Sequence, residues 1–377
     1  MIESPGIGLT LLAFLVVLGP LVFVHELGHY LVGRWCGVKA DTFSVGFGKE
    51  VAGYTDKRGT RWKFGWMPLG GYVQFAGDMS PASQPDKISP DVSPEERAQM
   101  FQTQPIWKRA AIVFAGPAIN FIFAFLILMG FAVAYGQSAT SPVIGEVMLN
   151  SAAQKAGLKV GDEILAIDGS KVDTFDDVAQ AVVLHAKKPI TVRCDRAGSE
   201  REVTFTLQEL TEKDKFGNEF KRGAMGIKSN GIEVQPVSLL EAPAVAIKQI
   251  KGILNLMVEG LRQIVVGDRS IKEMGGPLQI AKQSGEQAAL GWESLILFIA
   301  LVSINLGFIN LLPLPLLDGG HLLFYAIEAV RRKPASPKVQ EWAFRMGFAA
   351  VATLFLVVTF NDLGSFGVWD RLAGLIG

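Results

Sequence analysis

Two histidines and a glutamate lie close together near the end of a long apolar segment. His25, Glu26 and His29 form a His-Glu-x-x-His pattern, which on a helix places both imidazoles on one face, one turn apart. Such a pair can bind zinc, and the carboxylate between them can take a proton from a water molecule. Ionisable side chains at membrane depth are costly and are seldom kept without a partner or a task. The motif therefore predicts a metal site, in preference to a polar contact between packed helices.

A catalytic zinc site needs a third protein ligand and one open position. Asp318 is the favoured candidate, because it follows another apolar segment and its carboxylate lowers the net charge of the site. His321 lies three residues further along and is an alternative ligand. Pro313 and Pro315 would interrupt a helix here, which a membrane protein tolerates only where the freed backbone groups are buried in protein or line a wet cavity.

The composition fits a membrane protein with soluble parts. The chain has 377 residues, of which 49% are hydrophobic and 19% charged, and its formal net charge is zero, so nucleic acid is not expected as a partner. Four segments are apolar and long enough to span a bilayer: residues 7–31, 110–135, 294–317 and 342–360. The first lacks a basic start and a cleavage site, so we expect it to stay in the mature chain.

Basic residues near the ends of these segments set the expected orientation. They gather between the first and second spans and again between the third and fourth: Arg34, Lys39, Lys49, Lys57, Arg58, Arg61, Lys63, Lys108, Arg109, Arg331, Arg332, Lys333 and Lys338. Both loops are therefore expected in the cytoplasm, with residues 136–290 on the outer side. His25, His29 and Asp318 then share a depth toward the cytoplasmic face.

The loop after the first span contains two segments, 43–48 and 61–75, that are rich in aromatic, β-branched and glycine residues and predict short strands. These strands form either a small surface hairpin or an edge to which a substrate strand can add. A membrane helix buries its own backbone amides, and an edge strand can offer new partners to those groups once the helix is unwound. On the second interpretation the substrate-binding residues are Gly70, Gly71, Tyr72 and Val73.

Residues beyond the second span have the composition of a soluble domain. The stretch 144–169 resembles a PDZ domain of the type found in bacterial proteases, and one copy is expected within residues 136–232. An amphipathic helix is expected within 237–267. The chain accordingly divides into four parts: residues 1–135, 136–232, 233–290 and 291–377.

The His-Glu-x-x-His motif and the segment 310–321 together resemble those of the site-2 proteases, the intramembrane zinc metalloproteases. The resemblance is strongest to the bacterial group that includes the regulator of sigma-E protease. It implies an α-helical polytopic membrane protein with about four transmembrane helices, a membrane-associated β-hairpin and an inserted extracytoplasmic PDZ domain. It also implies that His25, His29 and Asp318 bind Zn²⁺ and that Glu26 is the general base.

The same resemblance implies a substrate class and a location. The enzyme would cleave single-span membrane proteins already shortened by another protease, such as anti-sigma factors or remnant signal peptides. It would lie in the bacterial inner membrane, with the active site toward the cytoplasm and the PDZ domain in the periplasm. Asn305 and Asn310 match asparagines near the substrate or the developing oxyanion, although both could instead form hydrogen bonds between helices.

Two other classes of protein could use the same polar residues. A transporter or channel could carry ions along them, and a non-catalytic scaffold could keep the PDZ domain without binding zinc. The residues do not name a substrate. They also leave open whether the PDZ domain recruits substrates or excludes bulky ones, and exclusion is favoured because no basic residue stands out as a partner for a peptide carboxylate.

Overall fold

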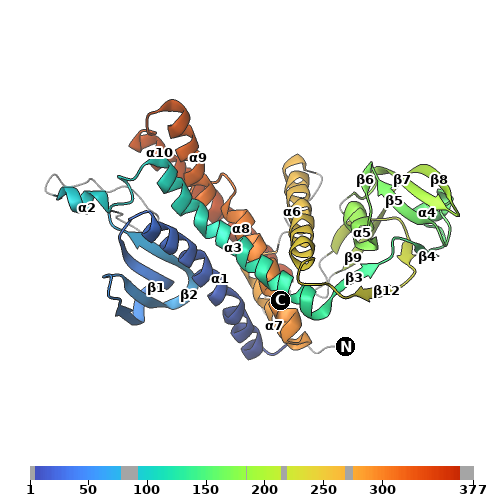
Figure 1. Cartoon of the computed structure of the whole chain (residues 1–377), viewed down its shortest axis with the longest axis horizontal. Coiled ribbons are helices and arrows are strands. Elements are labelled where there is room, and N and C mark those ends of the chain that lie inside the picture. The colour runs from blue at the N-terminus through green and yellow to red at the C-terminus, as the bar shows by residue number, and fades with distance from the viewer. Residues whose placement is uncertain (1–4, 78–91, 184, 214–218, 268–274, 366–377) are drawn as a thin grey trace, which may run out of the picture. The chain divides into compact units, whose positions relative to one another are not determined.

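The computed structural model describes residues 5–77, 92–183, 185–213, 219–267 and 275–365 (Figure 1). The chain divides into two compact units, which are described separately. The first contains residues 1–127 and 276–359, and the second contains residues 128–275 and 360–377.

Long apolar helices build the first unit. Within the described residues, four helices are long and apolar enough to cross a membrane: α1 (Ile7–Trp35), α3 (Ile106–Tyr135), α8 (Trp292–Asn310) and α10 (Pro337–Ser365). The last residues of α3 and α10 belong to the second unit. Three shorter helices complete the described part of the first unit: α2 (Pro94–Ala98), α7 (Pro277–Leu290) and α9 (Asp318–Arg331). The sequence prediction of four long apolar helices is confirmed.

The third predicted span was wrong at its C-terminal end. It was expected to reach residue 317, but α8 ends at Asn310 and a turn leads into α9 at Asp318. Pro313 and Pro315 lie in this turn, where each lacks a backbone N–H and constrains the residue before it, so the helix cannot continue. The apolar character of this turn explains why it resembled a continuation of the span.

Between α1 and α3 the chain forms a sheet of two long, bent strands, β1 (Ala40–Thr55) and β2 (Arg61–Phe75). Residues 40–45 of β1 lie between two parts of β2, because they pair with 61–64 on one side and with 71–75 on the other. The sheet packs on α1 through a buried core that includes Tyr30, Phe43 and Phe75. Residues 71–75 therefore form one edge of the sheet, beside the helix that carries the metal-ligand motif.

The second unit contains a domain built mainly of strands, here called the β-rich domain (residues 137–235). Its described strands are β3 (Gln137–Thr140), β4 (Ile144–Val147), β5 (Glu163–Ile167), β6 (Ser170–Lys171), β7 (Pro189–Arg196), β8 (Ser199–Thr206), β9 (Gln208–Lys213), β10 (Glu219–Ala224), β11 (Ile227–Ser229) and β12 (Ile232–Gln235). Its described helices are α4 (Ala152–Lys155) and α5 (Phe175–Val183). The first strand pairs with the last, so the chain enters and leaves the domain at one place.

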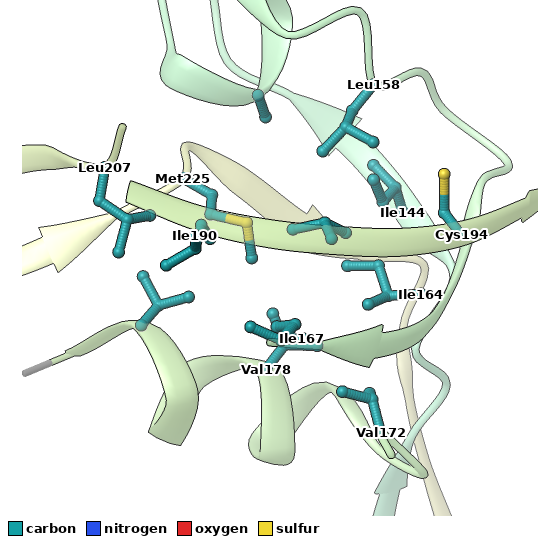
Figure 2. Packing of buried hydrophobic residues seen from close by; sticks show 13 residues of the cluster. Ile144, Leu158, Ile164, Ile167, Val172, Val178, Ile190, Cys194, Leu207 and Met225 are labelled. Atoms are coloured by element: carbon teal, nitrogen blue, oxygen red, sulfur yellow. The ribbon is translucent and has the colours of Figure 1, made fainter. Parts of the chain in front are cut away.

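Alternating apolar residues of these strands meet the inner face of α5 in one core, shown in Figure 2. Ile164, Ile190 and Val192 are fully or almost fully buried there. After the domain, α6 (Ala242–Val266) runs beside α5, where Lys248 Nζ lies 3.1 Å from Asp177 Oδ2. This agrees with the predicted helix at 237–267 and indicates that α6 braces the β-rich domain.

Candidate active site

The helix α1 brings the first three functional side chains together because of its regular spacing. His25 and His29 lie four residues apart and therefore share one face, with Glu26 beside them. His25 and Glu26 are almost completely buried, at 8% and 9% exposed. Buried ionisable groups need compensating partners, which the neighbouring helices must supply.

The third group comes from the start of α9. Asp318 occupies the first turn of this helix, where the positive end of the helix dipole favours a carboxylate. The helix is held in place at its other end by Arg109 of α3, whose Nη2 lies 2.8 Å from Glu328 Oε1 and whose guanidinium lies 4.9 Å from the centre of the Tyr325 ring. The Asp318 carboxylate thereby reaches both histidines: Oδ2 lies 3.2 Å from His25 Nε2, and Oδ1 lies 3.6 Å from His29 Nε2.

The separation of these three ligand atoms fits a tetrahedral metal ion. Ligand atoms about 2.1 Å from zinc in a tetrahedral site lie about 3.4 Å from one another. The two Nε2 atoms are 3.2 Å apart, and both are at a similar distance from the carboxylate. His29 Nδ1 donates to the Ile112 carbonyl at 2.8 Å, so in the neutral ring Nε2 carries a lone pair. Lone pairs of His29 and Asp318 therefore converge on one point, where a cation satisfies them.

Small residues let α1 and α3 approach closely at the site. A Cβ atom at Gly116 of α3 would collide with His29 Nε2 and come within 2.9 Å of His25 Cε1. A Cβ atom at Gly28 of α1 would collide with the Ala115 carbonyl oxygen and come within 2.8 Å of an Ile119 methyl group. Glycine at position 116 therefore gives the imidazole rings their space, and glycine at position 28 lets the two helix backbones approach each other.

The ligand atoms face a cavity of about 330 Å³. Its lining includes most of the residues that the sequence predicted for the site: His25, Glu26, His29, Gly70, Gly71, Tyr72, Val73, Asn310, Asp318 and His321. The structure thus brings these residues together. Asn305 is different, because its side chain is exposed on α8 and is not among the lining residues, so its predicted role with substrate stays a prediction without support from position.

The edge of the β1–β2 sheet enters the same cavity beside Glu26. The backbone N–H of Val73 donates to the Glu26 carboxylate. Gly71 lies so close that a Cβ atom there would be 3.0 Å from Glu26 Cγ. The predicted general base and the predicted substrate strand are therefore neighbours.

One buried polar residue of the site was not singled out by its sequence pattern. Asn120 of α3 is fully buried, and its side-chain amide lies 3.0 Å from His25 Nδ1. The available signal was a lone amide in the middle of an otherwise apolar span, which is costly unless it is used.

Long apolar helices, two histidines and an aspartate whose ligand atoms meet at one point, and a glutamate beside a cavity define a class: a metal-dependent hydrolase whose site is built on membrane-spanning helices. The chain belongs to peptidase family M50, whose model matches residues 13–354.

Three named proteins are similar in sequence to this chain along almost its whole length. A "Putative zinc metalloprotease" of Agrobacterium fabrum is 44% identical over 360 residues, covering 93% of this chain and 95% of that protein. One of the same name in Rhizobium meliloti is 44% identical over 359 residues, covering 94% and 96%. "Metalloprotease MmpA" of Caulobacter vibrioides is 35% identical over 394 residues, covering 98% and 99%. The chain is therefore a zinc metalloprotease and a membrane protein, which decides against the transporter and the non-catalytic scaffold.

Among solved structures, the PDZ domain of the SdrC-like protein from Listeria monocytogenes matches a quarter of the chain (25%) and 90% of that domain. The match has 17% sequence identity and a TM-score of 0.20.

Proposed function

We propose that this zinc metalloprotease hydrolyses peptide bonds in or next to the transmembrane segment of single-span membrane proteins that another protease has already shortened. The observation that carries the proposal is the place of the cavity. Its walls come from α1, α3 and α8, three helices long and apolar enough to span a membrane, and from the edge of the β1–β2 sheet. A segment cleaved there has to enter among apolar helices as an extended strand.

The residues of the chain divide the work of hydrolysis. His25, His29 and Asp318 would hold the ion, and when bound, zinc supplies a Lewis acid that activates water and polarises a carbonyl. Glu26 takes the proton of the attacking water and later delivers it to the departing amine. The edge at residues 71–75 holds the substrate backbone extended, and the Asn310 side chain is available to an oxygen that gains negative charge.

We further propose the bacterial inner membrane as the location, with the catalytic side toward the cytoplasm and the β-rich domain, a PDZ domain by its sequence resemblance, in the periplasm. The basic residues between the first two long helices and between the last two support this orientation. Anti-sigma factors and remnant signal peptides are the substrates that the sequence resemblance suggests.

The test uses the purified protein in lipid bilayers with a single-span substrate whose outer part has been removed. Mass spectrometry of the products should place the cut within or beside the apolar segment, and the Glu26→Gln variant should bind zinc normally yet release no product. Cuts confined to polar loops far from the span would refute the intramembrane assignment. In native cells, Glu26→Gln should retain uncut substrates, which can then be identified.

A further inference from the structure

The ring of His25 is in contact with a buried amide on the side away from the metal-ligand cluster. Its Nε2 atom lies 3.2 Å from Asp318 Oδ2, while its Nδ1 atom lies 3.0 Å from the side-chain nitrogen of Asn120. Asn120 is 0% exposed. The contact is therefore shielded from water. One of the two side chains must donate a proton in it and the other must accept that proton.

Only one arrangement of that proton is compatible with a metal ligand. A neutral imidazole carries one N–H, so a lone pair on His25 Nε2 requires the proton on Nδ1. The group opposite Nδ1 must then be an acceptor, whereas the amide nitrogen is a donor. The oxygen and nitrogen of an asparagine amide have nearly the same shape, and a half-turn about the last side-chain bond exchanges them.

The surroundings of Asn120 permit this half-turn. Its Oδ1 atom is buried and has no hydrogen-bond partner among the described residues, so exchanging the two atoms breaks no hydrogen bond on the far side. After the exchange Oδ1 faces His25 Nδ1 and accepts its proton.

His29 shows the same arrangement with a backbone group. Its Nδ1 atom donates to the Ile112 carbonyl, also on α3, at 2.8 Å. Two turns further along α3, Asn120 is itself anchored, because Ser303 Oγ of α8 donates to its backbone carbonyl at 2.8 Å. One helix thus supplies an acceptor to each ligand histidine.

We propose that Asn120 is a positioning residue, whose side-chain oxygen accepts the Nδ1 proton of His25 and holds that ring in the tautomer that binds zinc. Partners of this kind fix both the proton and the orientation of a ligand imidazole. The residue contacts no reacting atom and acts through His25.

The test is zinc affinity, measured by competition with a chelator on the full-length protein in detergent or bilayers. Asn120→Leu keeps the size of the side chain and removes the acceptor, and it should weaken zinc binding by about 10- to 100-fold. Asn120→Asp keeps an acceptor and should remain within a few-fold of the unaltered protein. Loss of affinity in both variants alike, or in neither, would overturn the proposal.

A second measurement separates positioning from a general packing role. The chain has four histidines, so ¹⁵N-histidine NMR of the zinc-free protein, in which the metal does not itself fix the tautomer, gives a simple spectrum. His25 should show a protonated Nδ1 in the unaltered protein and in Asn120→Asp. If Asn120→Leu does not fold, Asn120→Asp alone still decides the matter, because an Nε2-protonated His25 or a large loss of zinc affinity in this folded variant contradicts the assignment.

Discussion

At the scale of single residues, Asp318 and His321 lie one turn apart but meet different neighbours. The Asp318 carboxylate reaches the Nε2 atoms of both ligand histidines, whereas the His321 ring packs against Phe344, with ring centres 5.2 Å apart. His321 also lines the cavity. Among the described residues, however, the ligand atoms that converge on one point belong to His25, His29 and Asp318. The geometry therefore favours Asp318 as the third ligand, as the sequence did.

This difference predicts the metal content of two variants. Asp318→Asn removes the charged ligand and should abolish stable zinc binding, because a neutral amide oxygen cannot offset the charge of the ion. His321→Ala should keep about one zinc per chain. Elemental analysis of both purified proteins measures this directly, and full zinc in the first variant with loss in the second would reverse the assignment.

At the scale of elements, the close approach of α1 and α3 holds the site together. The two helices touch where Gly28 faces the Ala115 carbonyl, and Gly116 on the opposite helix faces the imidazole rings. Both contacts leave no room for a methyl group, so they fix the distance between the helix that carries the histidines and the helix that carries their acceptors.

Adding one methyl group tests this packing. Gly28→Ala should lower the free energy of unfolding by about 1–3 kcal/mol through overpacking and should reduce activity. Gly19→Ala is the matched control, since Gly19 lies on the same helix with nothing within 4 Å of the position of a Cβ atom. Denaturant unfolding in detergent compares the two, and equal stability would show that the helices can separate without cost.

The edge strand at residues 71–75 is the second element that the mechanism needs. The Ala76 N–H donates to the Lys39 carbonyl at 2.8 Å, toward the sheet. Successive residues of a strand direct their backbone N–H and C=O groups to opposite sides. The backbone groups of Phe75, Val73 and Gly71 therefore point away from β1. The outward N–H of Val73 already contacts Glu26, so a proline there would disturb the general base as well as the strand.

A change in the substrate avoids this complication. Synthetic peptide substrates with single N-methylated amides lose one backbone donor each, while the enzyme stays unaltered. If the substrate adds to the edge as a strand, cleavage should fall at every second position, because alternate residues face the edge. The cleavage rate of each peptide measures this, and losses that ignore the alternation would argue against strand addition.

At the scale of the whole molecule, the β-rich domain is a separate body joined at one place. A groove of about 210 Å³ runs between α5 and the strands β10 and β11. Its lining is apolar apart from Arg222, which the sequence did not mark as a candidate for binding a peptide carboxylate. The groove and Arg222 therefore support the recruitment of a peptide end, whereas the sequence favoured exclusion by size.

Removal of the domain distinguishes the two roles. Thr140 pairs with Ile232, so deleting residues 141–231 and joining the neighbouring strands with a short glycine–serine turn leaves the two ends in register. Under exclusion, the shortened enzyme should cleave substrates that keep their full outer domain, and cleavage should still depend on Glu26. Loss of cleavage of pre-shortened substrates, with zinc retained, would instead identify a recruiting domain. Gel analysis of both substrate classes gives the answer.

The sequence by itself determined the elements and most of the chemistry. Runs of apolar residues define the long helices, because only a helix satisfies its backbone within an apolar environment. The spacing of His25, Glu26 and His29 defines a shared face, and the rarity of a carboxylate at this depth marks Asp318. These are local properties, so they can be read from a few neighbouring residues.

Only the tertiary structure decided which groups complete the site. Asn120 and Ile112 meet the histidines because α1 and α3 pack closely, and the exposed position of Asn305 follows from which face α8 turns inward. The end of the third span also depended on the turn into α9. Such pairings join residues far apart in the chain, and they depend on side-chain volumes and hydrogen-bond geometry at the contact, which a one-dimensional pattern of polarity does not contain.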